Sequence, residues 1–225
     1  MNESVLIIGA GSGLSSSLAR LCASKGMKVL LASRNIEKLN KLKEEIKAYT
    51  YKCDASNYES VFNLFKETDK LIGTPNLVIY NASSRPKRAS IIDMDPSEVQ
   101  KAINITCFGA FLVAQESVKR MIKLKKGSIF FTGATAGIKG FANSSAFAMG
   151  KFGLRGLVQS LARELNPKGI HVAHFVIDGV IGKEPKGDYQ MMNPDEIAKT
   201  YLQFHKQDKS VWASEVELRT SVEKF

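Results

Sequence analysis

Val5-Leu6-Ile7-Ile8-Gly9-Ala10-Gly11-Ser12-Gly13-Leu14 opens the chain's first structural unit. The first four residues are continuously apolar, which is typical of a short buried strand. A glycine turn follows, and from Leu14 onward apolar residues recur at helical spacing. A strand, a glycine turn and a helix start form a site for a diphosphate, because glycines admit the phosphates and the helix start offers free N–H groups. The alternative is a tight strand-to-helix connection that binds nothing.

Strands and helices alternate along the rest of the chain. Further strands are expected at residues 28–33, 49–53, 76–80, 128–132, 170–177 and 211–213, and helices at 35–48, 58–71, 96–125 (bent near 109), 145–164 and 194–205. The strands are apolar on both faces, which predicts a parallel sheet covered on both sides. We therefore expect an α/β fold, a single doubly wound Rossmann-type domain over residues 1–225 with about seven parallel strands. Its ligands should bind outside the carboxyl ends of the strands.

Composition excludes several classes of protein. Of the 225 residues, 44% are hydrophobic and 24% charged, and no apolar run is long enough for a membrane span. Three distant cysteines suit a reducing compartment and suggest neither disulfides nor a metal site. With a strand beginning so near Met1, we expect no signal peptide and a cytoplasmic protein. The net charge of +10 comes from scattered lysines without a nucleic-acid motif, so we expect no nucleic-acid partner.

Short motifs follow the expected strands in an order that resembles the short-chain dehydrogenase/reductase family, from Gly9 to about Gly182. The matches are Gly9-x-x-x-Gly13 with Ser15 where the family has a third glycine, Asp54 after the third strand, Asn81-Ala82-Ser83 after the fourth, Asn104 and Lys151 at its active-site Asn and Lys, and Asp178-Gly179-Val180-Ile181 in place of its Pro-Gly turn. The resemblance implies a nicotinamide dinucleotide and a small-molecule substrate. The expected cofactor-binding residues are Gly9, Gly11, Ser12, Gly13, Leu14, Ser33, Arg34, Asp54, Ala55, Asn81, Ala82, Ser83, Lys151, Gly179 and Ile181.

Two of the family's catalytic positions differ in this chain. The family's Tyr lies four residues before the Lys, and its Ser about thirteen residues before the Tyr; here these positions hold Phe147 and Ala134. The resemblance implies that Lys151 binds the nicotinamide ribose and that Asn104 helps to position a water. Neither Phe147 nor Ala134 can donate a hydrogen bond. We therefore expect slow or absent turnover of simple ketones, aldehydes and secondary alcohols, or a substitute proton donor, for which Ser145, Thr135, Tyr189 and Lys151 are candidates.

The end of the second expected strand bears on the cofactor. Ala32-Ser33-Arg34 holds no carboxylate that would repel a 2′-phosphate, and Arg34 can clamp one, so NADP(H) is expected and NAD(H) is less favoured. The alternative is that Arg34 is a solvated residue before a helix. We expect an oxidoreductase that transfers hydride to or from a carbonyl or alcohol substrate. A nucleotide-binding protein without turnover, acting as a sensor or assembly partner, is the competing hypothesis.

The resemblance also bears on substrate and assembly. In the family, the segment at residues 179–194 covers the substrate, where Lys183 and Lys186 suit an acidic compound or are merely solvated. Asp178 either orients a substrate or caps the segment after Gly179. The family's two long helices, here at 97–125 and 145–164, pair across a two-fold axis, so a homodimer or homotetramer is expected.

Overall fold

The strands of this protein form one parallel sheet. The computed structural model describes residues 3–184 and 190–222. Its seven-stranded sheet has the order β3-β2-β1-β4-β5-β6-β7, built from β1 (Ser4–Ile8), β2 (Lys28–Ser33), β3 (Tyr49–Lys52), β4 (Leu77–Tyr80), β5 (Ser128–Thr132), β6 (His171–Asp178) and β7 (Glu215–Arg219). The strand order reverses between β1 and β4, where a doubly wound sheet opens a crevice for ligands. The predicted fold class is confirmed.

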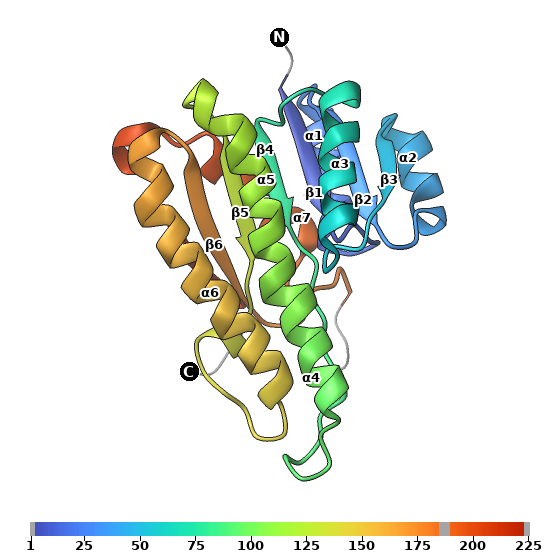
Figure 1. Cartoon of the computed structure of the whole chain (residues 1–225), viewed down its shortest axis with the longest axis vertical. Coiled ribbons are helices and arrows are strands. Elements are labelled where there is room, and N and C mark those ends of the chain that lie inside the picture. The colour runs from blue at the N-terminus through green and yellow to red at the C-terminus, as the bar shows by residue number, and fades with distance from the viewer. Residues whose placement is uncertain (1–2, 185–189, 223–225) are drawn as a thin grey trace.

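Helices cover both faces of the sheet (Figure 1). One face carries α1 (Leu14–Ser24), α2 (Asn40–Ile46) and α7 (Pro194–His205); the other carries α3 (Tyr58–Leu71), α4 (Pro96–Ile103), α5 (Gly109–Leu124) and α6 (Ser145–Leu165). Successive strand residues point to opposite faces, so Leu6 and Ile8 join the core under α3, α5 and α6, while Val5 and Ile7 join the core under α1 and α7. This double burial explains why the strands read as unbroken apolar runs.

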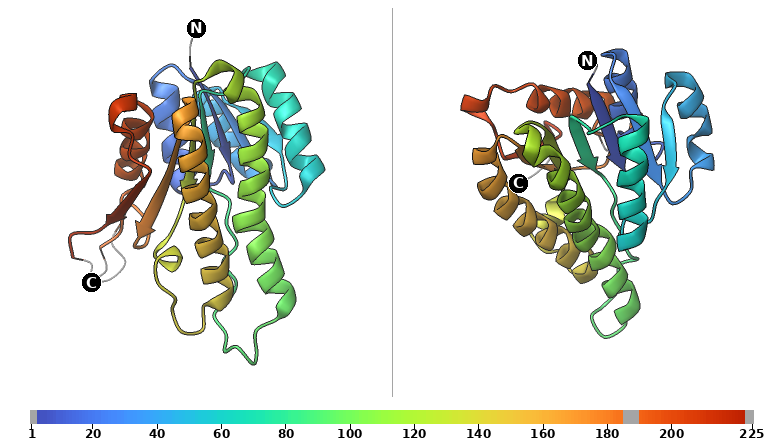
Figure 2. Two further views of the ribbon diagram at one scale, coloured as in Figure 1. Left: turned by 60° about the vertical axis from the view of Figure 1, so that its left-hand side comes forward. Right: turned by 45° about the horizontal axis from the view of Figure 1, so that its top comes forward.

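The expected helix at 96–125 is interrupted by a π-helical turn. Residues Asn104–Phe108 form this turn between α4 and α5, where the sequence suggested only a bend near Gly109. α4 packs beside α6, and the pair extends beyond the carboxyl ends of the strands (Figure 2). Close packing is possible because Gly150 has no side chain: a Cβ atom there would lie 3.1 Å from Thr106 Cβ. The two helices therefore border the region beyond the carboxyl ends of the strands, where ligands are expected.

Two expected elements are placed differently in the structure. The strand predicted at 211–213 is wrong: those residues follow Asp208 in a 3₁₀ turn and its exit, and β7 begins at Glu215. β7 is an edge strand that alternates charged and apolar residues, so it lacks the continuous apolar run used to find the others. The helix predicted at 35–48 starts as a 3₁₀ turn, Glu37–Leu39, and ends at Ile46 because Lys47 adopts a left-handed conformation, φ 53°.

Gly9 follows β1 and lies against the backbone of the segment that follows β4. Its φ is +80°, and a Cβ atom at this position would lie 2.4 Å from the Ala82 backbone nitrogen. Both the backbone conformation and the contact therefore require glycine. The close approach brings the glycine turn against the segment that follows β4.

Candidate functional site

A cavity of about 200 Å³ lies beyond the carboxyl ends of β1, β2, β3 and β4. It is lined by eight residues of the predicted cofactor site, which are Gly9, Ser33, Arg34, Asp54, Ala55, Asn81, Ala82 and Ser83, and by Ile8, Ala10, Cys53 and Ile105, which the sequence did not single out. We call it the dinucleotide cavity. The predicted residues belong to short sequence motifs. The four apolar lining residues are not defining positions of any such motif, because they contribute only to the shape of the cavity.

The N-terminus of α1 follows the glycine turn whose Gly9 and Ala10 line this cavity, but Gly11, Ser12, Gly13 and Leu14 are not among the lining residues. Gly13 is the N-cap residue, no side chain caps the helix, and its first turn carries no acidic residue. A Cβ atom at Gly11 or Gly13 would meet nothing within 4 Å, so space is open in front of the turn. Ser12 is exposed, whereas Leu14 is buried in the core and contributes only its backbone to the turn. Uncapped N–H groups and the helix dipole favour an anion here.

Ser15, at the family's third glycine position, ties the glycine turn to the segment after β4. Its hydroxyl donates to the carbonyl of Gly9 at 3.2 Å and accepts from the Asn81 side-chain amide at 2.7 Å. The Asn81 backbone N–H also donates to the Ile8 carbonyl at 2.8 Å. Asn81 is thereby fixed in both backbone and side chain at the boundary of the dinucleotide cavity.

Asp54, after β3, and Arg34, after β2, line the dinucleotide cavity and carry opposite charges. Partial burial raises the pKa of the Asp54 carboxyl, but hydrogen bonds from the Ser56 hydroxyl and backbone and the nearby charge of Arg34 outweigh it, so the pKa lies below its usual value. Asp54 is therefore a carboxylate at neutral pH. Arg34 is exposed at the rim, where its guanidinium is accessible to a ligand.

A second cavity of about 260 Å³ lies beyond β4, β5 and β6 and shares Asn81 and Ser83 with the first. It brings together Ala134, Phe147, Lys151, Gly179 and Ile181 from the predicted site, and adds Arg85, Thr132, Gly133 and Ile177. We call it the substrate cavity. The two cavities are continuous along one edge of the sheet, as the topology predicts.

Lys151 is the buried cation of the substrate cavity. It is 4% exposed, and its Nζ donates to the Thr132 carbonyl at 2.8 Å. Burial lowers the pKa of this amine to about 8, because the charged form loses its hydration. Its charge also contributes to lowering the pKa of His174 on β6, after the larger effect of burial. Lys151 therefore changes protonation close to physiological pH.

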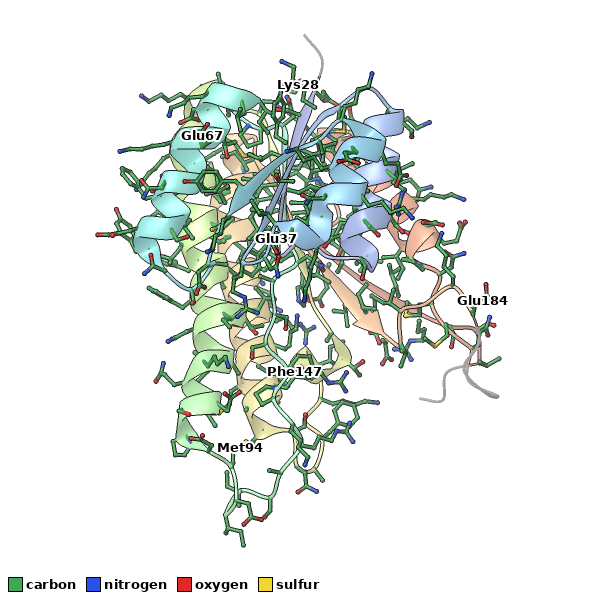
Figure 3. The ribbon with its side chains drawn as sticks, turned by 90° about the vertical axis from the view of Figure 1, so that its right-hand side faces the viewer. Lys28, Glu37, Glu67, Met94, Phe147 and Glu184 are labelled. Atoms are coloured by element: carbon green, nitrogen blue, oxygen red, sulfur yellow. The ribbon has the colours of Figure 1, made fainter. Side chains whose placement is uncertain are left out.

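Phe147 lies in the first part of α6, beside the segment that follows β4 (Figure 3). The Lys151 Nζ lies 5.8 Å from the centroid of its ring, and the guanidinium carbon of Arg85 lies 5.3 Å from the same centroid. Arg85 is a functional-site residue that the sequence did not reveal, because it stands in a polar loop among other cations. Its one sequence signal is its position, two residues after Asn81-Ala82-Ser83.

Other residues predicted to act in chemistry lie elsewhere. The Asn104 side chain accepts from Gln100 Nε2 at 2.9 Å, and Asn104 lines neither cavity in the described residues. The Thr135 hydroxyl donates to the carboxylate of Asp178, which also lies 3.4 Å from an Arg219 nitrogen. Among the lining residues of the part of the chain that the structure describes, Lys151 is the one remaining candidate donor, since Ser145 and Thr135 do not line the substrate cavity. Tyr189 lies outside the described residues.

An ion pair and a hydrogen bond join the segment after β6 to α7 and α1. The Lys183 ammonium pairs with Asp195 at 2.6 Å, and Asp195 also accepts from the Ser17 hydroxyl at 2.6 Å. Lys183 is thus engaged with α7 and α1 and does not line the substrate cavity, while Lys186 lies outside the described residues. Met192 is buried and pairs with Ile181, so it belongs to the core on the α1 side.

Comparison with known proteins identifies the family. The profile of the short chain dehydrogenase family matches residues 3–181. The 3-oxoacyl-[acyl-carrier-protein] reductase FabG of Rickettsia prowazekii is 32% identical over 169 residues, 74% of this chain and 68% of that protein. A short-chain dehydrogenase structure from Rhodopseudomonas palustris superposes with a TM-score of 0.87 at 34% identity, covering 98% of this chain and 99% of that one.

An alcohol dehydrogenase structure from Thermococcus sibiricus, complexed with 5-hydroxy-NADP, shares the fold, with a TM-score of 0.90 over 100% of this chain and 99% of that one, at 19% identity. None of the helices in the described ranges is long and apolar enough to cross a membrane. From the family profile and the relative at 32% identity, the chain belongs to the short chain dehydrogenase family.

Proposed function

We propose that this protein is an NADP(H)-dependent oxidoreductase that reduces a small carbonyl compound, with Lys151 supplying the proton that a tyrosine supplies elsewhere in the family. The observation that carries the proposal is the buried Lys151 amine in a cavity that also holds Ala134 and Phe147, adjoining a dinucleotide cavity. The relative at 32% identity is named as a reductase of an oxo group, which supports the same reaction class.

The residues present fit a dinucleotide. The uncapped start of α1 and the open space before Gly11 and Gly13 suit its diphosphate. The Asp54 carboxylate suits hydrogen-bond donors of an adenine, and Arg34 suits a 2′-phosphate. Lys151, Gly179 and Ile181 line the end where the nicotinamide half belongs. When bound, the nicotinamide supplies the hydride.

Lys151 then has two tasks in the proposed reaction. Its ammonium form attracts the negative charge that develops on the carbonyl oxygen, and it transfers one proton to that oxygen, giving the alcohol and a neutral amine that solvent reprotonates. A pKa of about 8 suits this role, since a general acid works best when its pKa lies near the working pH. The Thr132 carbonyl accepts a hydrogen bond from Nζ at 2.8 Å and so holds the amine at the carboxyl end of β5.

Titration with NADPH and NADH tests the cofactor. We expect tighter binding of NADPH, and Arg34→Ala should weaken NADPH binding by about 10- to 100-fold, since a hydrogen bond to a charged group contributes about 1.5–3 kcal/mol. NADH affinity should hardly change. Lys38→Ala, which removes an exposed cation from the neighbouring 3₁₀ turn, is the control. Equal affinities of the unaltered protein for both cofactors would exclude the proposed preference.

A panel of carbonyl compounds, followed by NADPH absorbance, tests the reaction itself. The proposed oxidoreductase function is supported if NADPH is consumed with any carbonyl compound of the panel and if replacement of Lys151 abolishes this consumption. Binding of NADPH without consumption across the panel favours the alternative, a nucleotide-dependent sensor or assembly partner.

An oligomer is also proposed. Large apolar side chains stand exposed along the π-helical turn, α5 and α6: Phe108, Phe111, Met149 and Phe152 are each between 41% and 52% exposed. Exposed aromatic residues of this kind on neighbouring helices suit an interface between copies of the chain. We expect light scattering at micromolar concentration to give a multiple of 24.7 kDa, and a mass of 24.7 kDa alone would contradict it.

A further inference from the structure

We infer that Arg85 is an anchor for a carboxylate, so that the substrate cavity takes small oxo acids and not neutral carbonyl compounds. The inference rests on the proposed function of the same cavity, and it goes further by assigning the substrate's chemical class. It is carried by the charge of the cavity, the placement of the Arg85 guanidinium and the anchoring of its loop.

The substrate cavity holds two cations and no anion among the lining residues that the structure describes. Arg85 and Lys151 contribute the positive charges, and the other lining residues are neutral. The nearest carboxylate along the chain, Asp178, accepts from Thr135 and pairs with Arg219. Two cations in a concave site leave an excess of positive potential, which favours an anionic ligand.

The guanidinium of Arg85 is placed to bind such a ligand. It lies 5.3 Å from the centre of the Phe147 ring, within the range of a cation–π interaction. Arg85 is exposed and forms no ion pair with any of residues 3–184 or 190–222, so its donors are free. A guanidinium matches the two oxygens of a carboxylate with a pair of parallel hydrogen bonds.

The loop that carries Arg85 is fixed on both sides of this residue. On one side, the Ser84 backbone N–H donates to the buried Thr106 hydroxyl at 3.1 Å. On the other, the Ala89 backbone N–H donates to the Asn143 carbonyl at 3.1 Å, which joins the loop after β4 to the loop before α6. Because the backbone is held in advance, less conformational entropy is lost when an anion binds.

The small size of the cavity limits the substrate further. At about 260 Å³ it is below the usual range of drug-sized pockets, roughly 300–1,000 Å³, and the nicotinamide must share it. A short oxo acid satisfies both the space and the charge. Arg85 would then hold the carboxylate while the keto group faces Lys151.

Oxamate, an unreactive carboxylate with the shape of a short 2-oxo acid, is the probe for binding. We expect saturable binding to the unaltered protein by calorimetry, and a loss of about 10- to 100-fold in affinity with Arg85→Gln. Arg85→Lys should recover only part of it, because an ammonium lacks the fork geometry. Arg88→Gln removes the same charge from the same loop outside the cavity and should bind oxamate like the unaltered protein. Oxamide, which has no carboxylate, should not bind.

Absence of oxamate binding, or equal binding by the Arg85→Gln and Arg88→Gln variants, overturns the inference. NADPH binding, measured separately, reports on the proposed function, so the two can fail independently. Steady-state kinetics with acetoacetate and with its neutral methyl ester distinguish binding of the carboxylate by Arg85 from an effect of Arg85 on the reaction. An anchor predicts that Arg85→Gln raises KM for acetoacetate alone. If the variant instead lowers kcat equally for both, Arg85 acts on the reacting oxygen and the carboxylate assignment is wrong.

Discussion

Replacing Lys151 with methionine is expected to lower the rate of carbonyl reduction by about 10²–10⁴-fold, the usual contribution of a general acid. Methionine fills a similar volume but has no proton to transfer. NADPH should still bind, because the glycine turn and Arg34 are untouched. Lys139→Met, which removes an exposed cation from the loop before α6, is the control and should leave the rate unchanged.

The same residue predicts the pH dependence of the reaction. Reduction requires the ammonium form of Lys151, so the rate should be constant at lower pH and fall as pH rises through about 8. Burial, which removes the hydration of the ammonium, is the cause of the lowered pKa of this amine. A reduction rate that rises through this range would contradict the role of acid.

Stability measurements separate lost chemistry from lost structure. The folded-state pKa of Lys151 lies below its ordinary value of 10.5, so charging this buried amine costs on the order of 3 kcal/mol at pH 7. That cost is present in full below about pH 8 and disappears as pH rises toward 10.5. The Lys151→Met variant does not have this cost, and its absence offsets the loss of the hydrogen bond from the ammonium to the Thr132 carbonyl, worth about 1.5–3 kcal/mol. We therefore expect no fall in its free energy of unfolding at pH 7.

The double change Ala134→Ser with Phe147→Tyr is expected to raise turnover by about 10²–10³-fold with acetoacetate. It returns an oxyanion donor and a proton donor to positions that line the substrate cavity beside Lys151. The new hydroxyls act on one developing charge, so the two gains are not expected to add in full. The ring of residue 147 is preserved, and with it the contact to Arg85.

Phe141→Tyr serves as the matched control, because it adds the same hydroxyl to an exposed aromatic residue outside the cavity. Steady-state rates over a pH series, with NADPH affinity measured in parallel, decide between the outcomes. Unchanged turnover in a double variant that still binds NADPH would mean that the cavity does not reproduce the family's reacting geometry.

The sequence predicted most of the fold because burial leaves a strong pattern. The strand limits at Ser128–Thr132 and the helix limits at Tyr58–Leu71 and Pro194–His205 agree with the structure to the residue. The central strands are buried on both faces, so they appear as apolar runs. β7, at the edge, has only one covered face, and its alternation Glu-Val-Glu-Leu-Arg was overlooked.

Position within a helix was harder to predict than the helix itself. His205 ends α7, yet its side chain is 6% exposed and its Nδ1 lies 2.8 Å from the Ser128 hydroxyl. The π-helical turn at Asn104–Phe108 was not predicted, because the apolar pattern runs on through it; in the structure this turn packs against α6, as α4 does.

The dinucleotide cavity was largely predicted because its residues belong to short motifs at strand ends. The substrate cavity was predicted only in part. In the sequence, Arg85 differs from the nearby cations Lys87 and Arg88 only in its position closer to Asn81-Ala82-Ser83, and all three are exposed. What singles it out is the ring of Phe147, contributed from about sixty residues later in the chain.

The location of both cavities beyond the strand ends has a consequence for which residues can be changed without disturbing the fold. Residues of the sheet interior are constrained by volume, whereas the residues that line the cavities are also constrained by chemistry. The buried cores and the cavity linings share Ile8, Ala10, Cys53, Ala55 and Ile177, all near strand ends, but Ala134 and Phe147 belong to the substrate cavity and to neither core. Residues 134 and 147 can therefore be changed to alter the reactivity of the cavity without a matching change in the packing of the interior. Such a division lets one scaffold drift toward new substrates while its architecture stays fixed.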